Sequence, residues 1–171
     1  MNWPLLIVGL VALERLGELV LAQRNTSALL RAGAQEIGGG HYPLIVLLHA
    51  AWLVSIYVFA DTRAPPIWGW VAFYAALQVL RYWTIASLGR YWTTRIITLP
   101  SAPLVTRGPY RFMRHPNYLV VILEITALPL AFDELQVAAI FCWFNAILIA
   151  WRVRIETRAL DARRSGAAPA P

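Results

Sequence analysis

Residues able to do chemistry gather in two stretches of the second half of the chain. The first, residues 89–118, contains five arginines and no acidic residue, and it closes with the run Arg114-His115-Pro116-Asn117-Tyr118. The second contains Arg152 and Glu156, which are four residues apart and share one face of a helix. Guanidinium groups bind carboxylates and phosphates, and tyrosine rings attract cations to their faces. Both stretches are therefore candidate binding sites for a charged ligand.

A plainer interpretation exists for each stretch. Arginines in a loop beside a membrane can hold lipid headgroups and set topology. Arg152 and Glu156 can form a surface ion pair, which contributes under about 1 kcal/mol. The position of Pro116 favours a ligand site, because proline suits the first turn of a helix. His115 and Asn117 would then lie at the positive end of that helix, where carboxylates and phosphates are stabilised.

The composition identifies the surroundings of these residues as a membrane. Of the 171 residues, 59% are apolar and 14% are charged, against about half and about a quarter in soluble domains. The many aromatic residues exclude a disordered chain, and Cys142, the only cysteine, excludes a disulfide scaffold. The net charge of +6 comes from arginines placed between apolar runs. This pattern indicates membrane orientation, and we expect no nucleic acid partner.

Five apolar runs approach the length of about 20 residues that crosses a bilayer. The expected spans are residues 3–22, 42–60, 66–88, 116–132 and 135–151, with a polar turn at Asp133-Glu134. The predicted fold is an all-α integral membrane protein with five transmembrane helices, a cytosolic cofactor-binding loop and a C-terminal helix. We expect one domain over residues 1–164 and a disordered tail over residues 165–171.

The arginines predict the orientation of these spans. With the N-terminus outside, twelve of the fifteen arginines fall on the inner segments 24–41, 89–115 and 152–171. Positive residues prefer the cytoplasmic side of a membrane. Both candidate stretches therefore lie on the cytoplasmic side, as does the C-terminus.

Ionisable residues also occur inside the expected spans. These are Glu14, Arg15 and Glu18 in the first span, Arg81 in the third and Glu124 in the fourth. Such residues are functional candidates, or they form Glu–Arg pairs that fix the packing of helices. We favour pairing for Glu14, Glu18 and Arg81 and leave both interpretations open for Glu124. His49 and Cys142 are interpreted as packing residues.

The motifs resemble those of the isoprenylcysteine carboxyl methyltransferases and the related phospholipid methyltransferases. The resemblance covers about residues 66–160 and rests on Leu104-Val105-Thr106-Arg107-Gly108-Pro109-Tyr110, then Arg114-His115-Pro116-Asn117-Tyr118, then Arg152 and Glu156 after one hydrophobic hairpin. The run from Glu14-Arg15 to His41-Tyr42-Pro43 is similar to the bacterial branch. Some members of that branch methylate alkylpyrones and similar polyketide lipids.

This resemblance implies a site for S-adenosylmethionine at the cytosolic face and a lipophilic oxygen acceptor that enters from the bilayer. Arg152 matches the position that handles the carboxylate or enolate of the acceptor, so Arg152 and Glu156 are the catalytic candidates. Glu124 is a second candidate for binding the acceptor or for acting as its base. No metal is implied. The cofactor contacts carried over are Ala102, Pro103, Leu104, Val105, Tyr110, His115, Pro116, Asn117, Tyr118, Glu156 and Arg95.

The chain departs from the family pattern at two positions. Val120 stands where a glycine usually follows the signature tyrosine by two residues, which affects the expected acceptor tunnel. The paired acids of the C-terminal helix are reduced to Glu156-Thr157, which bears on the role of Glu156.

Two functions from different classes follow. The first is a membrane-embedded S-adenosylmethionine-dependent O-methyltransferase in a bacterial inner membrane, acting on an isoprenylcysteine carboxylate-like acceptor or an alkylpyrone or phenolic lipid. An arginine-only basic set is typical of GC-rich bacterial genomes and favours the phenolic or enolic acceptor. The alternative is a non-catalytic small membrane protein, such as a lipid-binding or assembly factor or a transporter subunit, whose ionisable span residues line a polar path. Membrane lipids are expected partners, and the oligomeric state stays open.

Overall fold

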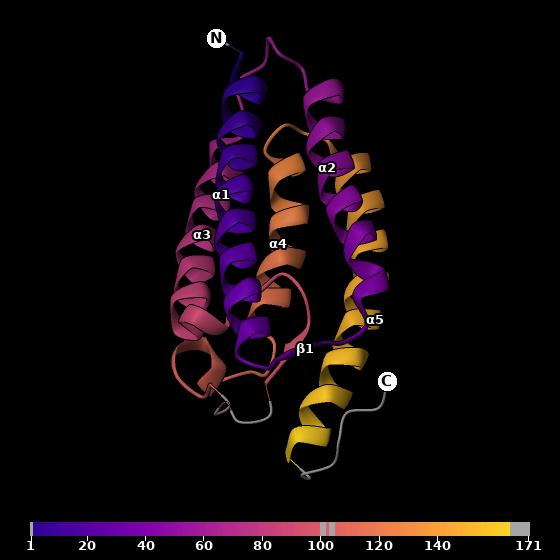
Figure 1. Ribbon diagram of the computed structural model, residues 1–171. Helices are drawn as coiled ribbons and strands as arrows, with labels where there is room; N and C mark the ends of the chain where they lie inside the picture. The colour runs from indigo at the N-terminus through magenta and orange to yellow at the C-terminus, as the bar shows by residue number, and fades with distance from the viewer. Residues whose placement is uncertain (1, 100–101, 103–104, 165–171) are drawn as a thin grey trace.

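The computed structural model describes residues 2–99, 102 and 105–164, which fold into an all-α bundle (Figure 1). Its long helices are α1 (Trp3–Arg31), α2 (Tyr42–Phe59), α3 (Trp68–Leu88), α4 (Pro116–Leu130) and α5 (Leu135–Arg164). The start of α1 and the end of α5 lie at opposite ends of the bundle. The all-α prediction is confirmed. The tail expected at residues 165–171 lies outside the described residues.

Two of these helices are long and apolar enough to cross a membrane, namely α2 and the segment Leu135–Ala159 of α5. Only 11% and 17% of their apolar windows are buried inside the protein. A helix in the core of a soluble protein would be mostly buried, so these two helices present their apolar side chains outward. Helix α4 is apolar but shorter, with 15 residues. The crossing of a membrane by all five helices remains a prediction.

The first and last helices continue past the expected spans, which end at residues 22 and 151. Helix α1 reaches Arg31 because its polar last turns bind the rest of the fold. There, the Asn25 side-chain amide donates to the carbonyl oxygens of Trp92, at 2.8 Å, and Gly89, at 3.2 Å. Helix α5 likewise runs without a break into the expected C-terminal helix. The limits of an apolar run therefore do not mark the ends of these two helices.

Helix α4 lies at the centre of the packing, between α3 and α5. It is turned into α5 by Asp133, whose φ of 62° reverses the chain, and by a hydrogen bond from the Glu134 N–H to the Pro129 carbonyl. This confirms the expected turn at Asp133-Glu134, although α4 ends at Leu130 rather than at residue 132. The Val120 side chain of α4 is fully buried in this packing.

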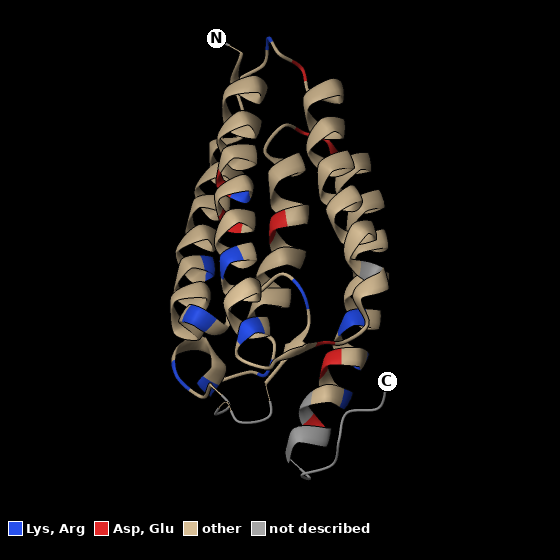
Figure 2. Ribbon diagram, viewed as in Figure 1, with Lys and Arg blue, Asp and Glu red and all other residues tan. Residues whose placement is uncertain are grey.

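Short elements join the connections at one end of the bundle. Strand β1 (Gln35–Glu36) pairs antiparallel with β2 (Ile97–Thr98), with Gln35 opposite Thr98. Three 3₁₀ turns, at Gly39–His41, Gly89–Tyr91 and Gly108–Arg111, complete these connections. The strand pair ties the α1–α2 connection to the loop between α3 and α4. Figure 2 shows that most Arg residues also lie towards this end.

Gly108 allows the loop to lie close against α3. Its φ is +59°, and a Cβ atom built there would lie 2.0 Å from Ser87 Oγ. The neighbouring Arg107 Nε donates to the Ser87 carbonyl at 2.9 Å. The loop therefore reaches its position only with glycine at residue 108.

We predict that Gly108→Ala lowers the thermal stability of the protein more than Gly33→Ala does. Gly33 also has a positive φ, of +89°, but nothing lies within 4 Å of a Cβ atom there. The control variant therefore carries only the backbone strain, about 1 kcal/mol, and Gly108→Ala adds a steric clash. Thermal unfolding in detergent measures both. Equal losses of thermal stability in the two variants would show that Ser87 moves away from the added Cβ atom at no cost in free energy.

Candidate active site

Two cavities adjoin at the end of the bundle where the strands lie. The loop cavity, of about 290 Å³, lies among the α3–α4 loop, the start of α4 and the end of α5. The bundle cavity, of about 360 Å³, runs between α1, α2, α4 and α5 and is mostly apolar. We call their shared wall the junction; it consists of Trp92, Thr93, Asn117, Tyr118 and Arg152.

A chain of hydrogen bonds crosses the junction. Arg152 Nε donates to the Tyr118 hydroxyl oxygen at 2.7 Å, and the Tyr118 hydroxyl donates to Glu156 Oε2. The imidazole of His115 stacks on the Tyr118 ring, with centroids 5.4 Å apart, and its Nδ1 lies 3.8 Å from Glu156 Oε1. The structure thus brings together the two chemical stretches of the sequence, as the resemblance implied.

Local helix geometry explains this arrangement. Pro116 occupies the first turn of α4, and the Tyr118 N–H bonds the His115 carbonyl at 3.2 Å. The two rings therefore leave the start of the helix on the same side. On α5, Arg152 and Glu156 are one turn apart. Because α4 and α5 form a tight hairpin, the first turn of one helix faces the extension of the other.

Tyr110 adds an aromatic ring to the wall of the loop cavity. Burial raises the pKa of its hydroxyl above the usual range, and the negative charge of Glu156 raises it further. The phenol therefore stays protonated and uncharged at neutral pH. An uncharged ring beside a carboxylate is a suitable surface for a cationic group.

Most of the predicted cofactor residues line the loop cavity. They are Arg95, Ala102, Val105, Tyr110, His115, Asn117, Tyr118 and Glu156. Pro116 is buried at the start of α4, where it has a structural role. Pro103 and Leu104 lie outside the described residues. The assignment of each as a cofactor contact stays a prediction.

Arg95 is already bound by protein groups. Its Nη1 lies 2.9 and 3.1 Å from the two carboxylate oxygens of Glu36, and its guanidinium lies 4.7 Å from the centroid of the Tyr42 ring. Arg95 thus links the strand pair to the start of α2. No motif pointed to Glu36, and the motif that contains Tyr42 gave no sign of this contact, because the roles of both residues depend on which loops meet.

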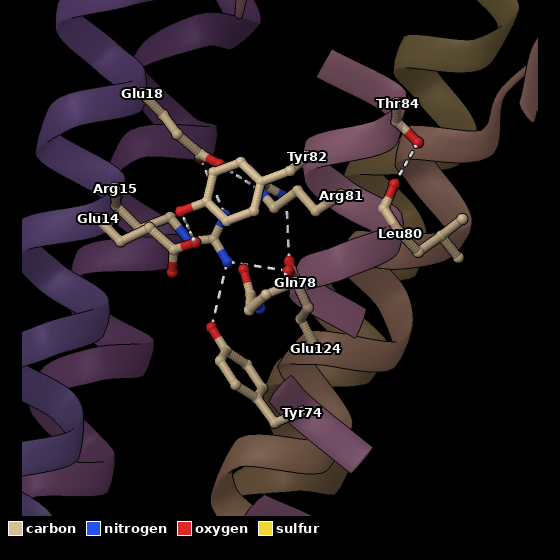
Figure 3. A network of polar contacts seen from close by, with 10 residues as sticks. All are labelled: Glu14, Arg15, Glu18, Tyr74, Gln78, Leu80, Arg81, Tyr82, Thr84 and Glu124. Atoms are coloured by element: carbon tan, nitrogen blue, oxygen red, sulfur yellow. Dashed lines mark hydrogen bonds and ion pairs between the residues drawn. The ribbon is translucent and has the colours of Figure 1, made fainter. Parts of the chain in front are cut away.

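Glu124 lies away from the junction, in a buried group of four charges (Figure 3). Its oxygens lie 3.0 Å from Arg15 Nη2 and 3.0 Å from Arg81 Nη1. Glu18 accepts from Arg81 Nε and Nη2 at 2.5 and 2.6 Å, and from Arg15 Nη1 at 2.9 Å. We call Arg15, Glu18, Arg81 and Glu124 the charge quartet. Its two positive and two negative groups join α1, α3 and α4.

The structure does not bring Glu124 onto the wall of either cavity. Its role in binding the acceptor therefore stays untested. Glu14 lies outside the quartet and accepts a 2.6 Å hydrogen bond from the Tyr82 hydroxyl. For Glu18 and Arg81 the pairing interpretation fits these contacts.

Sequence reasoning missed two polar residues on the wall of the bundle cavity, His49 and Asn145. His49 was interpreted as a packing residue because a lone histidine in an apolar helix carries no motif. Asn145 had one available signal, since it is an amide within an apolar run. Within the described part of the chain, no group of three or more His, Cys, Asp or Glu residues could hold a metal ion.

Comparison with known proteins gives one family and two relatives. The model of the isoprenylcysteine carboxyl methyltransferase (ICMT) family matches residues 70–162. An uncharacterized protein, YpbQ of Bacillus subtilis (strain 168), is 38% identical over 91% of this chain and 95% of its own length. An uncharacterized protein of Haemophilus influenzae is 24% identical over 86% of this chain and 88% of its own length. No solved structure matches the chain.

We predict that Glu124→Gln destabilises the protein strongly, whereas Glu14→Gln has little effect. The first change leaves two buried guanidinium groups with one carboxylate, and breaking a buried ion pair costs about 3–5 kcal/mol. The second removes a carboxylate charge that accepts a hydrogen bond from the half-exposed Tyr82. Thermal unfolding in detergent measures both variants. Unchanged stability in Glu124→Gln would contradict this structural role.

Proposed function

Because the chain belongs to the isoprenylcysteine carboxyl methyltransferase family, we propose that it is a membrane-embedded S-adenosylmethionine-dependent O-methyltransferase acting on a lipophilic acceptor. One observation carries this proposal. The hydrogen-bonded chain of Arg152, Tyr118 and Glu156 stands where the loop cavity meets the less polar bundle cavity. A site of this form can hold a charged cofactor on one side and a lipid on the other.

The residues of the loop cavity fit S-adenosylmethionine. The volume, about 290 Å³, is just below the usual range of ligand pockets, about 300–1,000 Å³. Tyr110, Tyr118 and His115 present rings, and Glu156 presents a carboxylate, to a cofactor that carries positive charges. The buried Oδ1 of Asn117 has no hydrogen-bond partner among the described residues, so it is open to a ligand donor.

The first turn of α4 supplies the complementary feature. His115 is its N-cap residue and makes no side-chain capping bond. Pro116 has no N–H, and the Tyr118 N–H bonds the His115 carbonyl, which leaves the Asn117 N–H of this turn for a ligand. Such groups favour the carboxylate of a ligand. When bound, S-adenosylmethionine supplies a methyl group activated by its positively charged sulfur.

Arg152 has the part of holding the acceptor oxygen. The guanidinium of Arg152 stabilises that oxygen as an anion, and the hydrogen bond from Arg152 Nε to Tyr118 fixes the orientation of the guanidinium. A lone pair of this oxygen forms the bond to the methyl carbon, and the electron pair of the broken carbon–sulfur bond stays on sulfur. Correct alignment and exclusion of water can lower the barrier by about 7–11 kcal/mol.

The need for a base depends on the acceptor. A carboxylate arrives ionised and needs none, whereas a phenol or an enol must lose a proton. Glu156, on the wall of the loop cavity, is the carboxylate bonded to the junction, and the Tyr118 hydroxyl that donates to it can pass on a proton from the acceptor. Both acceptor classes, isoprenylcysteine carboxylate-like and alkylpyrone or phenolic, are compatible with this arrangement.

The membrane arrangement is part of the proposal. All five long helices cross a bacterial inner membrane, with the N-terminus outside and the loop cavity and C-terminus in the cytoplasm. Support comes from the five arginines of residues 89–115, which belong to the loop-cavity end of the bundle. The bundle cavity then opens within the membrane, where a lipid can enter.

The non-catalytic alternative depended on a polar path through the spans. Arg15, Glu18, Arg81 and Glu124 bond to one another and join three helices. This pairing fits a structural function of these charges better than a transport path.

We predict that S-adenosylhomocysteine binds the detergent-purified protein saturably and that His115→Ala weakens the binding at least tenfold. The variant removes the imidazole that stacks on Tyr118 at the wall of the loop cavity. Arg154→Ala is the control, because Arg154 is exposed and lies on neither cavity wall. Isothermal titration calorimetry gives the affinities. A folded wild-type protein that binds nothing, with added lipid as well, would favour the non-catalytic function.

We also predict that Arg152→Ala reduces methyl transfer at least a hundredfold while the affinity for S-adenosylhomocysteine changes less than threefold. The lost guanidinium acts on the acceptor oxygen rather than on the cofactor. Transfer of a radiolabelled methyl group to a lipid extract of the source bacterium measures the rate, again beside Arg154→Ala. An undiminished rate in Arg152→Ala would contradict the assigned role.

A further inference from the structure

The polar groups on the wall of the bundle cavity differ in whether their hydrogen bonds are satisfied. Arg15, Glu18 and Arg81 line this cavity, yet each is held within the charge quartet by the contacts given above. His49, on α2, and Asn145, on α5, line the cavity as well, whereas the three charges lie on α1 and α3. His49 and Asn145 retain hydrogen-bonding capacity towards a ligand.

Asn145 has an unsatisfied donor. The residue is 2% exposed, and its Nδ2 has no hydrogen-bond partner among the described residues. An amide donor buried without a partner costs free energy, so such groups in folded proteins mark a ligand, a water or a strained site. Asn145 is surrounded by apolar neighbours of α5 and borders the cavity.

His49 has an available acceptor. Its Nδ1 lies 2.8 Å from the Ile45 carbonyl oxygen, which can only accept, so Nδ1 carries the proton. In the neutral ring Nε2 then has the lone pair. An edge-to-face contact with Trp52, with centroids 6.4 Å apart, fixes the plane of the imidazole.

Both residues lie deeper in the bundle than the junction. Asn145 precedes Arg152 by seven residues, which places it on the same face of α5 and roughly 10 Å along the axis. His49 is one turn before Trp52, whose Nε1 donates to the carbonyl of Ile125, and Ile125 lies two turns beyond Tyr118. The two polar groups are thus one to two helical turns from the junction.

We propose that His49 and Asn145, which lie one to two helical turns from the junction, form a polar recess that binds a second oxygen function of the acceptor. This rests on the proposed function, in which the acceptor occupies the bundle cavity. A hydroxyl group complements both residues, since it can donate to His49 Nε2 and accept from Asn145 Nδ2. The acceptor is therefore a lipid whose head carries at least two oxygen functions.

An acceptor with an uninterrupted hydrocarbon tail does not complement this wall. Such a tail would cover the amide donor and the imidazole acceptor without bonding to either, and it would remove any water bound there. Two oxygens placed across one ring, in contrast, reach the junction and the recess together. The recess therefore selects a polyoxygenated lipid over a prenyl chain.

The test measures lipid binding, which does not require turnover. The probes are an alkylphenol with one ring hydroxyl, the alkylresorcinol of the same chain length with two, and a farnesylated cysteine. Their affinities for the full-length protein in detergent are measured by calorimetry, with and without S-adenosylhomocysteine. The variants are Asn145→Leu and His49→Phe, which keep size and ring shape. Leu148→Ala is the control, because Leu148 is an apolar residue of the same wall.

We expect the wild-type protein to bind the alkylresorcinol at least tenfold more tightly than either other probe. In Asn145→Leu and His49→Phe the ratio of alkylresorcinol to alkylphenol affinity should fall within about threefold of unity. Leu148→Ala should weaken the binding of both phenols and preserve the ratio. Equal affinities in the wild-type protein, a ratio unchanged in both recess variants, or equal binding of the farnesylated cysteine would overturn the recess. A failure of S-adenosylhomocysteine to bind would instead contradict the methyltransferase proposal.

Discussion

The structure depends on the pairing of four buried charges. An arginine or a glutamate within a membrane is costly unless an opposite charge meets it. Arg15, Glu18, Arg81 and Glu124 meet this condition together, with each guanidinium in contact with both carboxylates. Because the four residues come from α1, α3 and α4, only one register of these helices satisfies all of them. The quartet therefore fixes the walls against which the bundle cavity forms.

The α4–α5 hairpin turns that fixed register into a site. With α4 held by the quartet at Glu124, its first turn has one possible position, and Asp133 brings α5 back alongside it. Tyr118 is then placed between Arg152 and Glu156 and is bonded to both. The hydrogen-bonded chain at the start of α4 thus gains its geometry from the ion pairs of Glu124, about two turns further along the same helix. Stability and ligand positioning share one helix.

The sequence predicts much of this, and its failures have physical causes. Apolar runs located all five helices, and the Arg-His-Pro-x-Tyr motif located the start of α4, because each signal is local. The end of α1 at Arg31 was missed, since the turns of this helix outside the apolar run are stabilised by loop contacts such as that of Asn25. His49 and Asn145 were missed as cavity residues. Their significance lies in the unpartnered Nδ2 of Asn145 and in the position of His49 on the cavity wall, and both become visible only once neighbours are placed.

The two cavities divide the recognition of ligands by polarity. The loop cavity offers rings, a carboxylate and the start of a helix, which suit a charged and water-soluble cofactor. The bundle cavity offers mostly apolar surface, in which even a single hydrogen-bonding group discriminates strongly because no water competes for it. A saturated quartet contributes nothing to that discrimination, since all its charges are already neutralised. In the proposed function, selectivity for the acceptor would therefore arise from polar groups of the wall such as Asn145 Nδ2, which has no hydrogen-bond partner among the described residues.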